Sequence, residues 1–136
     1  MNYWIFQAVS DRYDLRAELV EGRKVTWYAT RYRSYMAPGD LVFFWLGGSE
    51  DIRGIYGWGK LTSPPYAKPE WASYGVDVEY AKRLRAHLSA QEIKSVPDLQ
   101  GLLILRAPQA TNFLLSQEEA RAIANLIELG QRPEGC

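Results

Sequence analysis

The sequence predicts one α+β domain: a small, mainly antiparallel, strongly curved β-barrel with short flanking helices. Three observations support this prediction. The chain has 136 residues, which is the usual length of a single domain, so we assign residues 1–136 to one unit. Short apolar runs rich in β-forming residues alternate with turn signals along its first half. One of these runs also contains three glycines, which favours a sharply curled sheet.

The N-terminal third begins with a strand. Residues 2–9 (NYWIFQAV) are almost continuously apolar, which is typical of a central strand. Residues 10–22 start with a polar turn and continue as a short helix, in which Leu15 and Leu19 share one face. Residues 24–35 mix aromatic and basic side chains without a clear period. We expect a loop or an irregular strand there.

A hairpin is predicted in the middle of the chain. The turn at 38–40 (PGD) leads into a buried strand at 41–46 (LVFFWL). A second turn at 47–49 (GGS) leads into a strand at 53–62 (RGIYGWGKLT), and the two strands should pair antiparallel. The second strand contains Gly54, Gly57 and Gly59. Either a curl of the sheet or a ligand lying against the backbone would require them, and the curl is favoured.

The rest of the chain alternates loops with short elements. Residues 63–69 are predicted as an irregular loop and residues 76–80 as a half-exposed strand, because apolar and polar side chains alternate there. Residues 101–105 (GLLIL) are predicted as a buried strand, and residues 106–115 as a loop before the last helix.

Two helices are predicted from capping boxes. Ser89 with Glu92 begins a short helix, and Ser116 with Glu119 begins the last one. The last helix should end at Gly130. Its predicted apolar stripe consists of Ala120, Ile123, Ala124 and Ile127.

Charge and cysteine content narrow the class of protein. Sixteen basic residues balance sixteen acidic ones, so the chain is not one that coats nucleic acid by bulk electrostatics. The cations of residues 23–35 form a local basic patch without an acid between them. The single cysteine, Cys136, allows no disulfide framework. With no signal peptide or apolar span evident, we expect a cytoplasmic protein without a membrane partner.

Catalytic, metal and cofactor signals are missing from the sequence. His87 is the single histidine, and its mixed, basic surroundings suggest a surface position. Neither metal-ligand spacing nor a phosphate-binding or dinucleotide-binding glycine motif occurs. The adjacent carboxylates at 50–51 and 118–119 fit a turn and a helix N-terminus. We therefore expect no catalytic residue, no metal and no cofactor.

Aromatic residues are concentrated in the first part of the chain. Of 18 Phe, Trp and Tyr residues, all but Phe113 precede residue 81. Residues 26–35 (TWYATRYRSY) combine flat rings, hydroxyl groups and cations. A flipped or single-stranded base needs these groups for stacking, edge recognition and phosphate contact. Alternatively, Trp27 and Tyr28 are ordinary core rings, and the sequence leaves both interpretations open.

The order of several motifs resembles the EVE domains, members of the PUA-like group that also includes the YTH and ASCH domains. The resemblance spans nearly the whole chain. It rests on residues 3–6 (YWIF), 26–27 (TW), 38–45 (PGDLVFFW), 54–57 (GIYG) and 107–113 (APQATNF). Each motif is modest alone, but together and in this order they are fairly specific.

This resemblance implies a barrel with a pocket for a modified base. Trp27 would form one wall and Thr30 would follow it, while Ser10 and Asp11 would flank the pocket. Trp45, Trp58, Tyr66 or Trp71 could form the second wall. Many EVE chains carry a lysine where this chain has Gln7.

Side-chain chemistry then suggests a role for each group. Trp27 would stack on the base, so Trp27→Ala should abolish binding and leave the fold intact. Lys24, Arg31 and Arg33 would contact flanking phosphates. Thr111 or Asn112 would read a base edge; alternatively, both stabilise their loop.

The expected function is therefore non-catalytic recognition of a modified base. Methylated or hydroxymethylated cytosine and methylated adenine, in DNA or RNA, are the bases that the resemblance implies. A separate effector, such as a nuclease, would be a further partner. One alternative is an ASCH-like hydrolase of modified nucleosides, with Lys60, Thr62 and Glu79 as its parts. The other is a module that binds a protein or a small ligand.

Overall fold

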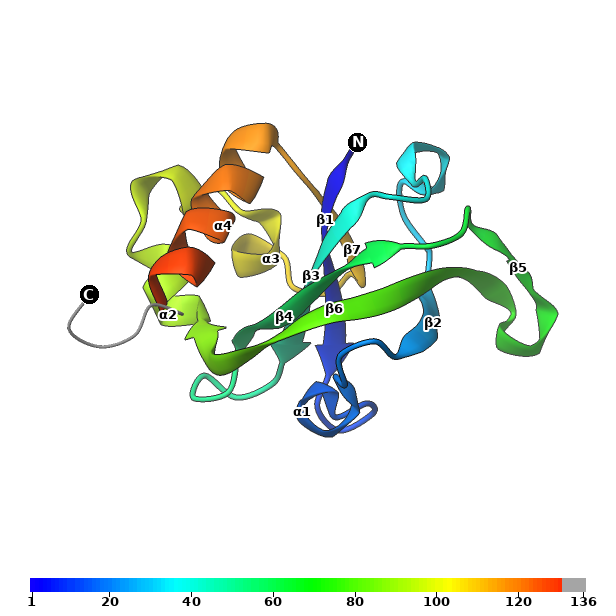
Figure 1. The fold of residues 1–136 in the computed structure, drawn as a ribbon, viewed down its shortest axis with the longest axis horizontal. Helices are drawn as coiled ribbons and strands as arrows, with labels where there is room; N and C mark the ends of the chain where they lie inside the picture. Colours follow the sequence, from blue (N-terminus) through cyan, green and yellow to red (C-terminus); the bar gives the residue numbers. More distant parts are fainter. Residues whose placement is uncertain (131–136) are drawn as a thin grey trace.

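Seven strands form one sheet in the computed structural model, which describes residues 1–130 (Figure 1). Cys136 lies outside these residues. The bounds of the strands are β1 Tyr3–Val9, β2 Lys24–Tyr28, β3 Leu41–Gly47, β4 Gly54–Leu61, β5 Tyr66–Lys68, β6 Ser73–Ser89 and β7 Asn112–Leu115.

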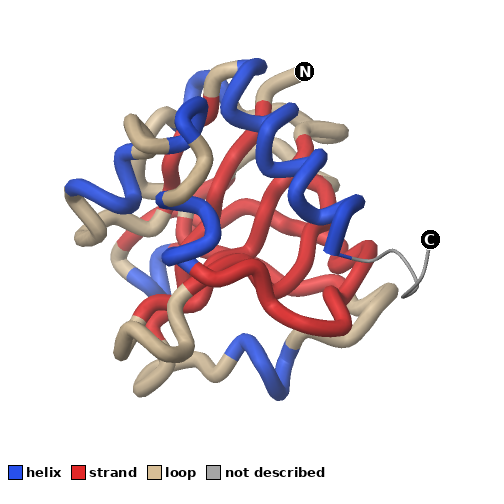
Figure 2. The backbone as a smooth tube through the Cα atoms, turned by 90° about the vertical axis from the view of Figure 1, so that its left-hand side faces the viewer, coloured by secondary structure: helices blue, strands red, loops and turns tan. Residues whose placement is uncertain are grey.

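The sheet is mixed and strongly curled. Its strand order is β2-β6-β4-β3-β1-β7, and β5 pairs with β6. The β1–β3 pair is parallel, and the other pairs are antiparallel. Figure 2 shows the strands wrapping into a half-barrel. This architecture confirms the predicted mainly antiparallel, curved sheet with short helices.

Within residues 1–130, four α-helices and three 3-10 turns accompany the sheet. The helices are α1 Leu15–Glu18, α2 Ala90–Lys94, α3 Leu103–Arg106 and α4 Gln117–Gly130; the turns are η1 Arg33–Tyr35, η2 Pro69–Trp71 and η3 Pro97–Leu99. Helices α2, α3 and α4 gather at one side of the molecule, and α1 lies apart from them (Figure 1). Among the described residues, no helix is long and apolar enough to cross a membrane.

The predicted helix caps are present. The Ser116 hydroxyl accepts from the Glu119 amide at 3.1 Å, and the Glu119 carboxylate accepts from the Ser116 amide at 2.9 Å. This reciprocal pair is a complete capping box. At α2 the Ser89 hydroxyl accepts from the Glu92 amide. In α4, Ala120 and Ile123 are buried as expected, whereas Ala124 is exposed and is not part of the packed stripe.

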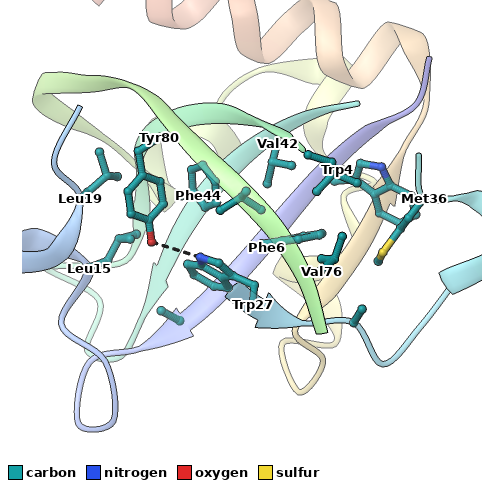
Figure 3. Packing of buried hydrophobic residues seen from close by; sticks show 14 of the residues in the cluster. Trp4, Phe6, Leu15, Leu19, Trp27, Met36, Val42, Phe44, Val76 and Tyr80 are labelled. Carbon is teal, nitrogen blue, oxygen red and sulfur yellow. Dashed lines mark hydrogen bonds between the residues drawn. The ribbon is translucent and has the colours of Figure 1, made fainter. Parts of the chain in front are cut away.

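Apolar side chains pack on both faces of the sheet. Inside the curl, one cluster combines alternate residues of β1 and β3 with residues of α1, β2 and β6 (Figure 3). On the other face, the intervening residues of β1 and β3 pack against α2, η3, α3 and α4. A strand that is buried on both faces has a continuously apolar sequence, and this explains the sequences of β1 and β3.

The three glycines of β4 lie where β6 comes close to it. A Cβ atom on Gly54, Gly57 or Gly59 would clash with a backbone carbonyl of β6. The β4–β6 register shifts between Ile55 and Gly57 and again between Trp58 and Gly59. Such irregularities increase the local bend and twist of a strand. The backbone that lies close to these three glycines is therefore that of β6, the neighbouring strand.

Five segments differ from the prediction. Residues 101–105 are not a strand, because the helix α3 begins at Leu103. The predicted loop at 106–115 contains β7, and residues 63–69 contain β5. Residues 24–28 form a regular strand, since they pair with β6 in continuous register. Strand β6 extends over residues 73–89, well beyond the predicted 76–80.

Candidate functional site

The sheet is left open between its two end strands. No strand ladder joins β2 to β7. One buried side chain, that of Asn112, connects them instead. Its Nδ2 donates to the Tyr28 carbonyl at 3.0 Å, and its Oδ1 accepts from the Thr30 amide at 2.9 Å. The Asn112 amide therefore substitutes for strand pairing and closes one part of the seam.

A cavity of about 570 Å³ occupies the seam beside this closure. It lies between the end of β1 and the free edge of β2. Its lining is mostly apolar and aromatic, with a few polar groups: Gln7, Ala8, Val9, Arg12, Tyr13, Glu18, Val25, Thr26, Trp27, Tyr28, Trp71 and Thr111. Sites of this size and composition commonly bind small molecules or single groups of a larger ligand.

The free edge of β2 supplies backbone hydrogen-bonding groups to the cavity. Ala29 donates its amide to Tyr74 of β6 at 3.0 Å. Because successive residues of a strand point their peptide groups in opposite directions, those of Thr26 and Tyr28 face away from β6. The contact of the Tyr28 carbonyl with Asn112 agrees with this direction. The Thr26 peptide groups and the Tyr28 amide are thus directed toward the seam.

Trp27 forms the floor of the cavity and is also part of the core. Its side chain is only 7% exposed. Its ring centroid lies 6.0 Å from that of Phe6, 5.7 Å from Tyr13 and 5.4 Å from Phe44. Trp27 is therefore a core ring that also lines the cavity, and its contact with a base stays a prediction. The burial corrects the expectation that Trp27→Ala would leave the fold intact, because removing a buried Trp costs about 3–5 kcal/mol.

A short chain of hydrogen bonds fixes the polar atom of this ring. Trp27 donates its indole Nε1–H to the Tyr80 hydroxyl at 3.1 Å (Figure 3). The Tyr80 hydroxyl lies 2.9 Å from that of Tyr13. Burial raises the pKa of the Tyr80 phenol. Burial also raises the pKa of Tyr13, although its hydrogen bond with Tyr80 acts in the opposite direction. Both phenols are therefore protonated at neutral pH.

A pair of aromatic rings, Tyr28 and Trp71, lies at the rim of the cavity. Tyr28 and Trp71 have ring centroids 4.6 Å apart, and Lys68 Nζ lies 4.7 Å from the Trp71 ring centroid. Trp71 belongs to η2 and is only half-buried. Among the four residues considered for a second wall, Trp71 is the one that lines the cavity.

The other residues predicted for the pocket fall into three places. Thr111 lines the cavity. Thr30, Ser10 and Asp11 lie in loops beside it, with the Thr30 hydroxyl 3.3 Å from Asn112 Oδ1. Trp45 is fully buried in the second core cluster, on the other face of the sheet, and does not reach the cavity.

Asn112 is not placed to read a base edge. Its side chain is fully buried, and both ends of its amide are bonded to the backbone of the Tyr28–Arg31 segment. It therefore acts on the shape of the seam.

The predicted phosphate contacts lie at or beyond the two ends of β2 and do not line the cavity. Lys24 begins the strand, and Arg31 and Arg33 follow its end; all three are exposed. The Arg33 guanidinium lies 4.1 Å from the Tyr74 ring centroid. Lys24 and Arg31 are seven residues apart, up to about 23 Å at 3.3 Å per residue, so they would contact different phosphates.

Arg12 and Tyr13 line the cavity but were not predicted as site residues. Both directly follow the polar turn at Ser10 and Asp11, which was recognised as a flank of the pocket. The turn folds back because the Arg12 and Tyr13 amides both donate to the Val9 carbonyl. That return of the chain to the end of β1 has no clear sequence signal.

The parts considered for a hydrolase lie elsewhere. Lys60 Nζ and Glu79 Oε1 are 3.9 Å apart on the sheet, and neither residue lines the cavity. His87 stacks on Tyr56 with a ring-centroid separation of 4.6 Å. In the cavity itself, Glu18 is paired with Arg23 at 3.0 Å. Within residues 1–130, no group of three or more His, Cys, Asp or Glu side chains is arranged to hold a metal ion.

The curled sheet and its seam define a small half-barrel domain with one aromatic cleft. The family model of the EVE domain matches residues 2–126. The chain therefore belongs to the EVE domain family.

Solved structures share the fold at low sequence identity. A hypothetical protein from Leishmania major matches with a TM-score of 0.78 and 20% identity, over 97% of this chain and 98% of that one. Human THYN1, in complex with DNA that contains 5-methylcytosine, matches with a TM-score of 0.72 and 16% identity, over 98% and 99% of the two chains.

A YTH domain also shares this fold. The Toxoplasma CPSF4-YTH domain matches with a TM-score of 0.60 and 16% identity, over 97% of this chain and 87% of that one. A search among curated proteins gave no match to this sequence.

Proposed function

We propose that this protein is a non-catalytic reader of a modified nucleobase in nucleic acid. The observation that carries the proposal is the aromatic cavity at the open seam of the sheet. Its volume of about 570 Å³ is ample for a single flipped base. Enzymes and readers that act on one base of a strand commonly take it out of the stack into such a pocket.

The cavity walls suit the two surfaces of a base. The Trp27 floor and the rim rings, Tyr28 and Trp71, offer flat apolar contacts. The free peptide groups of β2 offer donors and acceptors for the base edge, which need no reorganisation because the strand is already fixed by β6. A modified base differs from its parent by one small group, so a preformed pocket can discriminate by shape and hydrogen bonding together.

The cations around the cavity suit the flanking phosphates. Arg12 lines the cavity itself, Lys24 begins β2, and Arg31 and Arg33 follow the end of that strand. A few local cations on a chain with no net charge favour contact beside the flipped base over a long electrostatic footprint. Binding should therefore weaken with salt, but with the shallow slope of a few phosphate contacts.

Methylated or hydroxymethylated cytosine and methylated adenine are the bases to test, in DNA and in RNA. The structural similarity to human THYN1 bound to 5-methylcytosine DNA supports placing 5-methylcytosine first. We expect the protein to present the bound strand to a separate effector, such as a nuclease. Glu18 is the acidic side chain of the cavity lining, and it forms an ion pair with Arg23. This pairing supports a binding role over a catalytic one.

The test is a titration by fluorescence anisotropy. Oligonucleotides with one modified base, and matched unmodified ones, are titrated with the wild type and with Trp71→Ala. Base–aromatic stacking contributes about 1–3 kcal/mol, so Trp71→Ala should weaken modified-base binding by roughly 5- to 150-fold. Trp58→Ala is the matched control, because Trp58 packs on the other face of the sheet. Thermal unfolding checks that both variants are folded.

Two results would contradict the proposal. One is equal binding of modified and unmodified strands, or binding of neither. The other is turnover of a modified nucleoside incubated with the protein, followed by liquid chromatography, which would assign the cavity to an enzyme. Co-purification of a peptide or metabolite in the cavity would instead favour an interaction module.

A further inference from the structure

The Tyr13 and Tyr80 hydroxyl groups form a hydrogen bond whose direction follows from burial and donor count. We propose that Tyr80 is the donor in this bond, and that the Tyr13 hydroxyl donates into the cavity, to an acceptor atom on the edge of the bound base. The second part rests on the proposed function. It makes Tyr13 a specificity-determining residue.

The direction of the relay begins at Trp27. An indole Nε1–H can only donate, so the Tyr80 oxygen must accept from it across 3.1 Å. Tyr80 is fully buried, and a buried hydroxyl proton without an acceptor costs about 1–3 kcal/mol. Among the described residues, Tyr13 Oη at 2.9 Å is the acceptor within reach of Tyr80. The Tyr80 proton therefore lies on the line to Tyr13.

The proton of Tyr13 must then point elsewhere. Tyr13 is half-buried and lines the cavity, and its ring and that of Trp27 form an edge-to-face pair with 5.7 Å between centroids. Its oxygen already accepts from Tyr80, so a ligand that offered only another donor there would compete with a fixed hydrogen bond. A ligand that offers an acceptor completes the chain. Hydrogen bonds in such a series also polarise one another, which strengthens the last donor.

The ligand class follows from this polarity. The edge of every standard base carries a ring-nitrogen or carbonyl acceptor, and methylation at C5 of cytosine or at the exocyclic amine of adenine leaves these acceptors in place. Tyr13 would thus read the base edge, and the modification itself would be sensed by other groups. The rim and floor rings alone would hold any flat apolar group, and the Tyr13 donor adds the requirement for an acceptor.

Neutron diffraction from a deuterated crystal tests the direction without any ligand. We expect the deuterium of Tyr80 between the two phenol oxygens and the deuterium of Tyr13 directed into the cavity. A Tyr13 deuterium located between the two oxygens would overturn the inference.

Binding of an oligonucleotide with one 5-methylcytosine tests the role in recognition. Tyr13→Phe keeps the ring and removes the donor, so affinity should fall about 10-fold, as expected when a base acceptor is left unpaired. Tyr80→Phe removes the same interphenol bond but keeps the Tyr13 hydroxyl. It also leaves the Trp27 Nε1–H without its acceptor, so it should lower the midpoint of thermal unfolding at least as much as Tyr13→Phe does, with less than about a 3-fold loss of affinity. Tyr35→Phe, at an exposed tyrosine outside the cavity, is the control.

The pattern across the variants separates the possible results. If affinity fell in proportion to stability in both Tyr13→Phe and Tyr80→Phe, the role of Tyr13 would be structural and the inference would be overturned. Unchanged affinity in Tyr13→Phe would overturn it as well. If the wild type bound no modified strand, the proposed function would fail and the ligand assignment with it, while the neutron result would still decide the direction of the relay.

Discussion

Replacing Asn112 by alanine tests whether one side chain closes the seam. The substitution removes two short hydrogen bonds to the backbone, one to the Tyr28 carbonyl at 3.0 Å and one from the Thr30 amide at 2.9 Å. Each bond contributes about 1 kcal/mol, and some further loss arises from the backbone groups left without a partner. We therefore expect Asn112→Ala to lower the free energy of unfolding by about 2–3 kcal/mol.

Urea denaturation followed by tryptophan fluorescence measures this loss. Thermal unfolding provides a second measure. For a domain of this length, a loss of 1 kcal/mol corresponds to roughly 3–4 °C, so the midpoint of thermal unfolding should fall by about 6–12 °C. Asn125→Ala is the control, because Asn125 is exposed on α4. Hydrogen exchange should show that the Thr30 and Arg31 amides lose protection, while the β3 amides keep theirs. A loss below about 0.5 kcal/mol would refute the closure by Asn112.

Three further predictions concern packing, a buried carboxylate and pH. Gly59→Ala should destabilise the fold by about 2 kcal/mol in urea, since its Cβ would meet the β6 backbone, whereas Gly101→Ala, with open space around it, should not. Asp40→Ala should cost about 2–3 kcal/mol, because Trp4 Nε1 loses its acceptor at 3.0 Å; an unchanged midpoint would contradict this role. Above pH 10 an unfolded tyrosine releases its proton while buried Tyr80, with its raised pKa, keeps it, so stability falls with pH by up to about 1.4 kcal/mol per unit. Tyr80→Phe should make that decline shallower, and parallel pH curves for the two proteins would speak against it.

The sequence predicted the parts of the fold that depend on local pattern. The apolar runs of β1 and β3 and the box at Ser116 identified their elements, because burial on both sheet faces and helix capping leave short-range signals. The secondary-structure predictions failed where tertiary contacts determine the local structure. Residues 101–105 are as apolar as a strand, yet α3 begins within them at Leu103, and a short apolar run does not distinguish a strand from a helix.

The candidate site was predictable only in outline. Trp27 and the rings near it were evident from composition and motif order. That Trp27 is buried in the core and also lines the cavity was not evident, because the neighbours of a ring depend on how the sheet curls. The same holds for Asn112, whose partners lie more than 80 residues away. Tyr13 and Arg12 reach the cavity through a turn whose geometry is fixed by the end of β1, so their position was visible only in three dimensions.

The place of β1 in the sheet has a consequence for folding. Its two neighbours are β3, with Tyr3 opposite Leu41, and β7, with Tyr3 opposite Leu115. During synthesis β1 therefore remains without one of its two partners until the residues of β7, Asn112–Leu115, have been made. Long-range pairings of this kind slow folding and leave apolar segments exposed during synthesis. We expect C-terminal truncations that remove β7 to aggregate through the apolar residues of β1.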